Sequence, residues 1–150
     1  MAADRSYVSV NDHERHRLEA LVDKLDDKAL SRPMPAGWTV ASVLAHLAFW
    51  DQRIIVLVDL LKRGASIPPL ENAVDVEWIN DAAKPAQLAL PPRRAATLAV
   101  ETARATDQAV AALSDDLLAK NAAAGSPVNL LRAEHRREHL DEIEQALKRL

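Results

Sequence analysis

Three histidines have the residue type and the spacing that metal chemistry requires. His135 and His139 are four residues apart in a segment with helical periodicity, so both rings lie on one face and can chelate a single ion. His46 lies on the apolar side of another predicted helix, three residues after Val43 and four before Trp50. Three neutral imidazoles suit Zn, Ni, Fe or Cu. They also leave coordination positions open, which is the arrangement of catalytic rather than structural sites.

The same spacing also fits ordinary core histidines, each hydrogen-bonded to a neighbouring helix. The charged residues near these histidines also allow a functional and a structural interpretation. Asp51, five residues beyond His46, is either a partner or base behind the site or, as we favour, part of a surface salt bridge. Arg132 and Arg136 flank the histidine pair and could receive an anionic group, although we favour a solvated helix face for them.

A second histidine pair, His13 and His16, is one helical turn apart near the N-terminus. The residues around it are charged, among them Asp12 and Arg15, which is typical of a solvated surface. Exposed histidines at this spacing arise easily by chance, so we predict that these two do not bind metal.

Apolar residues that recur every three or four positions mark the helices that must position these side chains. Long helices are predicted at Asn11–Ala29, Thr39–Arg63, Pro92–Leu113 and Pro127–Arg149, and a short one near Asn72–Ala83. Thr39 and Ser126 are the expected N-caps of two of them, and Pro85 is expected to end the short one. The sequence therefore predicts an all-α fold: one domain over residues 1–150, built as a four-helix bundle with a long connection that carries a short extra helix.

Composition excludes several classes of partner. The 150 residues are 49% hydrophobic but only 3% aromatic, and 19 basic and 22 acidic residues give a net charge of −3. Such a balance cannot hold a phosphate backbone, so nucleic acid is not expected as a partner. The absence of cysteine excludes disulfides and thiolate ligands. With no expected signal peptide and no apolar run expected to span a bilayer, we predict no membrane partner and a cytoplasmic location.

Two segments resemble the DinB-like/YfiT-like superfamily. One is Trp38-Thr-Val-Ala-Ser-Val-Leu-Ala-His46-Leu-Ala-Phe-Trp50-Asp51, a tryptophan-led helix with a His-Leu-x-x-Trp motif; the other is Glu134-His135-Arg-Arg-Glu-His139-Leu-Asp-Glu-Ile143, with a His-x-x-x-His motif. Helix order and spacing agree over nearly the whole chain, but only these two motifs are specific. The resemblance implies a four-helix bundle that binds one divalent metal ion, with Zn or Ni preferred, at His46, His135 and His139.

The resemblance also indicates which classes of function to expect. Characterised members of the superfamily include transferases that depend on low-molecular-weight thiols, such as mycothiol or bacillithiol, and hydrolases that open reactive natural products. It therefore implies a metal-dependent enzyme that acts on a small electrophile, with a thiol as a further cofactor. The alternative is a bundle that binds or sequesters a small molecule without turnover. Family habit and alanine-rich helix faces also predict a homodimer.

Overall fold

The computed structural model describes residues 2–70 and 72–148. Its long helices are α1 (Tyr7–Lys24), α3 (Val40–Lys62), α4 (Ala73–Ala89), α5 (Pro92–Ala111) and α7 (Ala133–Lys148). Shorter pieces are α2 (Asp27–Leu30), the 3-10 turn η1 (Pro35–Gly37) and α6 (Asp115–Ala123). Over this part of the chain there are no strands, only one isolated bridge between Pro33 and Thr39. The predicted all-α class is confirmed.

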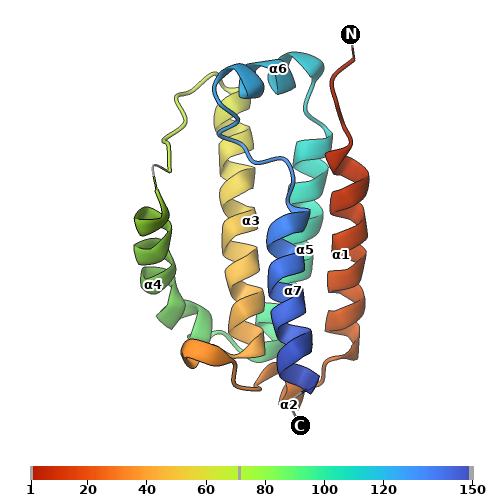
Figure 1. Ribbon diagram of the computed structural model, residues 1–150, viewed down its shortest axis with the longest axis vertical. Helices are drawn as coiled ribbons and strands as arrows, with labels where there is room; N and C mark the ends of the chain where they lie inside the picture. The colour runs from red at the N-terminus through yellow and green to blue at the C-terminus, as the bar shows by residue number, and fades with distance from the viewer. Residues whose placement is uncertain (1, 71, 149–150) are drawn as a thin grey trace.

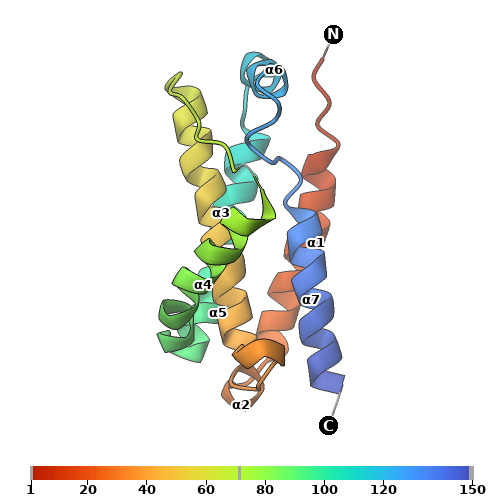
Figure 2. The same cartoon turned by 60° about the vertical axis from the view of Figure 1, so that its left-hand side comes forward.

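Four helices form the bundle: α1 and α7 run in one direction, and α3 and α5 run in the other (Figure 1). Because α3 and α5 are parallel, the chain must return between them. It does so through α4, which lies on the side of α3 away from α1 (Figures 1 and 2). The small helices α2 and α6 lie at opposite ends of the bundle. The long connection with an extra helix is therefore present, and it forms the crossover of the bundle.

Helix α3 is the central element, and its predicted ends are confirmed. Thr39 and Ser42 form a reciprocal capping box at its start, and Gly64 just beyond its end has a φ of 68°. By length and composition α3 could cross a membrane, which the sequence analysis did not anticipate. However, 72% of its most apolar 18-residue window is buried against the rest of the protein, as in the core helix of a soluble bundle.

The last helix begins later than predicted, at Ala133 rather than Pro127. Ser126 is not its N-cap but lies just after the turn at Ala124 and Gly125, with a φ of 57°. The buried Asn121 amide pairs with both backbone groups of Val128, donating to its carbonyl and accepting from its N–H, at 3.0 Å each. These bonds hold the segment before Ala133 in a non-helical path. The predicted end at Arg149 lies outside the described residues.

Other boundaries also differ from the prediction. The first helix begins at Tyr7, so Asn11 lies inside it, and it ends at Lys24, after which Asp26 caps the separate α2. Helix α6 was missed, although Ser114 caps it in the usual way. Pro85 does not end α4, which continues through it to Ala89.

The core has two apolar clusters separated by a polar layer. The cluster near α2 contains Leu18, Leu47, Ala103 and Leu140, and the cluster near α6 contains Tyr7, Ile54, Val110 and Val128. Between these levels, each bundle helix contributes buried polar side chains: Asn11 and Glu14 from α1, Asp51 from α3, Thr106 and Asp107 from α5, and Arg136 from α7. The candidate site is built beside this layer.

Candidate metal centre

His46 is placed by the start of helix α3. The capping box that begins the helix is short and reciprocal: Thr39 N–H donates to Ser42 Oγ at 2.8 Å, and Ser42 N–H donates to Thr39 Oγ1 at 3.1 Å. His46 follows in the second turn and is 7% exposed. Its ring meets the Trp38 ring edge-on, with centroids 5.7 Å apart. The first turns of α3 therefore fix the position of this imidazole.

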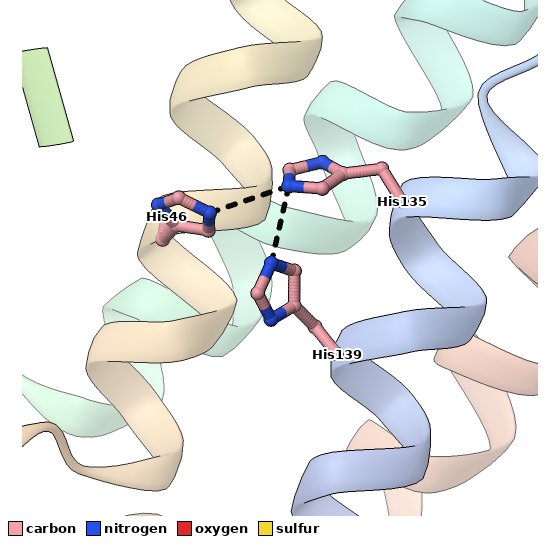
Figure 3. Close-up of side chains that lie close together, drawn as sticks. All are labelled: His46, His135 and His139. Atoms are coloured by element: carbon pink, nitrogen blue, oxygen red, sulfur yellow. Dashed lines mark hydrogen bonds between the residues drawn. The ribbon is translucent and has the colours of Figure 1, made fainter. Parts of the chain in front are cut away.

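His135 and His139 come from consecutive turns of α7 and point toward His46 (Figure 3). The Nε2 atom of His135 is 3.3 Å from His46 Nε2 and 3.1 Å from His139 Nε2. The ligand atoms of all three rings lie within 4.8 Å of one another. The structure thus brings together the three histidines that the sequence singled out, although His46 and His135 are 89 residues apart in the chain.

Two of the three nitrogen–nitrogen distances fit a divalent metal ion, and the His46–His139 distance is within 4.8 Å. A neutral imidazole has one N–H, so His135 Nε2 can pair well with only one of its two histidine neighbours at a time. A metal ion, by contrast, accepts a lone pair from each ring. Nitrogens that bind tetrahedral Zn at about 2.0–2.1 Å are about 3.3–3.4 Å apart, close to the 3.1 and 3.3 Å observed. The donor set suits Zn or Ni, and ligation by these histidines stays a prediction.

Burial keeps two of the three rings in the form that binds metal. Burial, with a smaller contribution from His139, lowers the pKa of His46 to about 4. Burial and the charges of the neighbouring histidines and arginines lower the pKa of His135 to about 3. Both imidazoles are therefore neutral at pH 7, with a lone pair available for an ion.

The Nδ1 atoms of His139 and His46 have different surroundings. His139 Nδ1 is 3.2 Å from Glu142 Oε2, one turn further along α7. This is the carboxylate–histidine contact that orients a metal ligand and fixes its tautomer when Nε2 is bound. The Nδ1 atom of His46 is buried and has no hydrogen-bond partner among the described residues. Sequence reasoning missed Glu142, although its spacing of three from His139 on a helix could have indicated it.

Asp51 lies in a salt bridge, as favoured, but the bridge is buried rather than at the surface. Its carboxylate accepts from Arg132 Nε at 3.0 Å and from an Arg136 terminal nitrogen at 3.1 Å. Arg136 also makes a bidentate pair with Asp107, at 2.7 and 2.8 Å. Burial opposes the positive charge, but the two carboxylates outweigh it and raise the pKa of Arg136. Asp51 therefore supports the arginines, and its described contacts do not include a histidine.

The predicted solvated face for the two arginines is wrong. Arg132 is 5% exposed and Arg136 is 1% exposed. The signal was present in the sequence, because Arg136, Leu140 and Ile143 share one stripe of α7, and Arg132, just before the helix, continues the same spacing. A charge on an apolar stripe requires a buried partner, and Asp51 and Asp107 occupy matching stripe positions on α3 and α5.

A cavity of about 550 Å³ opens beside the histidines. Trp50 lines it, and its indole N–H donates to Asn80 Oδ1 at 2.7 Å, which ties α4 to the cavity wall. The lining combines aromatic, aliphatic and charged side chains, among them Trp38, Val43, Ile54, Arg53, Arg132, Glu138 and Glu142. This volume and mixture suit a small organic molecule held against the three imidazoles.

The outcome for the second histidine pair is as expected. His13 and His16 are exposed on α1, far from the other histidines in the chain, as the charged neighbourhood predicted. Glu14, between them, is nevertheless buried and accepts hydrogen bonds from Arg17 and Arg137, which its charged neighbours did not indicate.

Comparison with known proteins gives one match. The family model described as the mycothiol maleylpyruvate isomerase N-terminal domain matches residues 12–144. No curated protein and no solved structure matches the sequence. The matched range contains both motifs and all three inward histidines.

Proposed function

Because the chain belongs to the mycothiol maleylpyruvate isomerase N-terminal domain family, within the DinB/YfiT-like superfamily, we propose that it is a metal-dependent enzyme that uses a low-molecular-weight thiol. Its substrate in this proposal is a small electrophile. The observation that carries the proposal is the convergence of three imidazoles on one cavity. The family description names mycothiol, which makes a thiol of that class the first choice. The reducing cytoplasm is the predicted location for such a reaction.

The three histidines would hold the ion through their Nε2 atoms, with Glu142 orienting the His139 ring. When bound, a divalent ion supplies Lewis-acid chemistry, polarising an electrophile and lowering the pKa of a thiol or water. Glu138 lines the same cavity between the two histidines of α7. We assign its carboxylate the role of accepting the thiol proton.

Electrostatics indicate the charge of the molecule that binds. Arg53 and Arg132 both line the cavity. Burial and the charge of Arg132 both lower the pKa of Arg53, so the two guanidinium groups are close enough to repel each other. An anion between them would relieve this repulsion. We therefore propose that the electrophile or the thiol carries a carboxylate that these arginines receive, with Asp51 holding Arg132 in place.

The test combines metal content with turnover. We expect purified protein exposed to Zn or Ni to hold one ion per chain, and to form a thioether from mycothiol and the fluorogenic electrophile monochlorobimane faster than the uncatalysed reaction. His135→Ala should lose the metal and the rate, and Glu138→Gln should keep the metal and lose rate.

The matched control is His13→Ala, an exposed histidine whose loss should change neither readout. One ion per chain without turnover of thiol or electrophile would contradict the enzyme and support the sequestering bundle. Equal metal occupancy in wild type and His139→Ala would contradict the metal site itself.

A further inference from the structure

A second concave region lies on the other side of the α3–α4 pair, between α3, α4 and α5. It is a groove of about 670 Å³, within the range of small-molecule sites. Its walls are mainly apolar, formed by Phe49, Val56, Ile79, Leu90 and Leu98 with several alanines. Trp50 and Arg53 line both this groove and the histidine cavity. The two spaces are therefore neighbours that share one wall.

One buried polar side chain in this groove is left unpaired. Gln87, on α4, is 7% exposed and lines the groove. Neither its amide nitrogen nor its amide oxygen has a hydrogen-bond partner among residues 2–70 and 72–148. Burying an amide with both groups unpaired is unfavourable. The bundle avoids this elsewhere, since the buried amides of Asn11 and Asn121 each donate and accept one hydrogen bond.

The chemistry of the Gln87 amide defines which ligand group would satisfy its hydrogen bonds. A primary amide presents a donor and an acceptor side by side in one plane. The matching edge is another donor and acceptor pair in a plane, as in a lactam, an imide or a cis amide. The apolar walls and the exposed ring of Phe49, which is 38% exposed, suit a flat hydrophobic body behind that edge.

We propose that this groove is a second small-molecule site, which takes a flat, mainly apolar compound whose lactam or imide edge pairs with the Gln87 amide. The proposal is independent of metal binding, because Gln87 does not line the histidine cavity. It assigns α4 a function beyond closing the crossover between α3 and α5.

The experiment uses 1,8-naphthalimide as the probe and N-methyl-1,8-naphthalimide as the matched compound without the N–H donor. Binding is measured by titration, with the Gln87 side-chain amide signal followed by nitrogen–proton correlation NMR. We expect 1,8-naphthalimide to shift that signal and to bind about tenfold more tightly than its N-methyl analogue. Gln87→Leu should remove the difference between the two compounds.

Gln52→Leu is the control variant, because Gln52 lines the same groove but is exposed. It should keep the wild-type difference in affinity between the two compounds, and circular dichroism should show both variants folded. Equal binding of the two compounds by the wild type would overturn the proposal. A Gln87 amide signal that shifts with protein concentration but not with 1,8-naphthalimide would also overturn the proposal, because it would show a second copy of the chain in the groove. A Gln87 amide that contacts only water would overturn it as well.

Discussion

Arg136 at the centre of the bundle and Gln87 in the groove beside α4 are polar side chains that lie almost entirely out of solvent. The terminal nitrogens of Arg136 donate to Asp51, to Asp107 and to the Asn11 carbonyl. The amide of Gln87 makes no such contact within the described chain. Burial alone therefore does not distinguish these two side chains; Arg136 leaves only its Nε unpaired, whereas Gln87 leaves both groups of its amide unpaired within the described chain.

The histidine centre lies between these extremes. His139 has an orienting carboxylate in Glu142, but the Nε2 atoms of the three rings face one another rather than separate partners. A partly satisfied polar cluster beside a cavity is typical of a binding site. The comparison predicts that removing a partner in the layer around Arg136 destabilises the fold, while changes near the histidines and Gln87 affect binding first.

The largest effect is expected at Asp107. Asp107→Ala would leave the buried Arg136 charge with half of its carboxylate partners, so we expect the free energy of unfolding to fall by about 3–5 kcal/mol in urea denaturation. Asp115→Ala is the control, because its ion pair with Arg5 is at the surface, with side chains 59% and 38% exposed. It should cost less than about 1 kcal/mol. Similar losses in the two variants would contradict the structural role of the layer.

The next effect is expected at Glu142, behind His139. Glu142→Gln removes the carboxylate that orients the ring, so we expect Zn affinity to fall about 10- to 100-fold in competition with a chelating dye. Stability without metal should stay nearly unchanged. Glu134→Gln, an exposed position on the same helix, is the matched control. If both variants bind Zn like the wild type, Glu142 is not the orienting group.

A smaller effect is expected from pH on the metal-free protein. The folded pKa values of His46 and His135, about 4 and about 3, lie below the unfolded value of about 6.5. The unfolded state therefore takes up protons first as pH falls. Their contribution to stability should be complete above about pH 6.5 and decrease from there toward pH 4. Thermal unfolding between pH 7.5 and 5 measures it, and a pH dependence unchanged in His46→Gln would argue against this cause.

The smallest effect, of opposite sign, is expected at Gln87. Gln87→Leu removes two unpaired polar groups from an apolar groove, so the free energy of unfolding should rise by up to about 1 kcal/mol. Urea denaturation of this variant beside Asp107→Ala tests the contrast directly. A loss of more than 1 kcal/mol would mean that Gln87 belongs with Arg136, as a structural group.

Periodicity and capping signals predicted the bundle because both depend on local spacing, whereas the convergence of His46 with the α7 pair was implied by the resemblance to the DinB-like/YfiT-like superfamily. The Thr39 cap, the inward side of His46 and the shared face of the His135–His139 pair follow from helix geometry alone. The late start of α7 did not follow, because it depends on Asn121, whose amide replaces helical hydrogen bonds at Val128. Such a contact between a side chain and a distant backbone leaves no periodic signal.

The polar layer was missed for a different reason. Arginine at an i,i+4 spacing is usually exposed, so Arg132 and Arg136 were assigned to solvent. Their carboxylate partners lie on two other helices, and only the packed bundle shows which charges meet. The unpaired amide of Gln87 could not be predicted for the same reason. Only the packing of the helices shows that the described chain supplies it with no hydrogen-bond partner.

Asn11 connects the two ends of the chain with several hydrogen bonds. Its amide donates to the Leu130 carbonyl at 2.8 Å and accepts from Ala133 N–H, the first residue of α7, at 3.0 Å. These contacts span 119 and 122 residues of sequence. Contacts of such separation bring a high entropy of loop closure, so we expect them to form after the folding barrier is crossed. Asn11 would then set how long the native protein survives, by slowing unfolding, while leaving the speed of folding nearly unchanged.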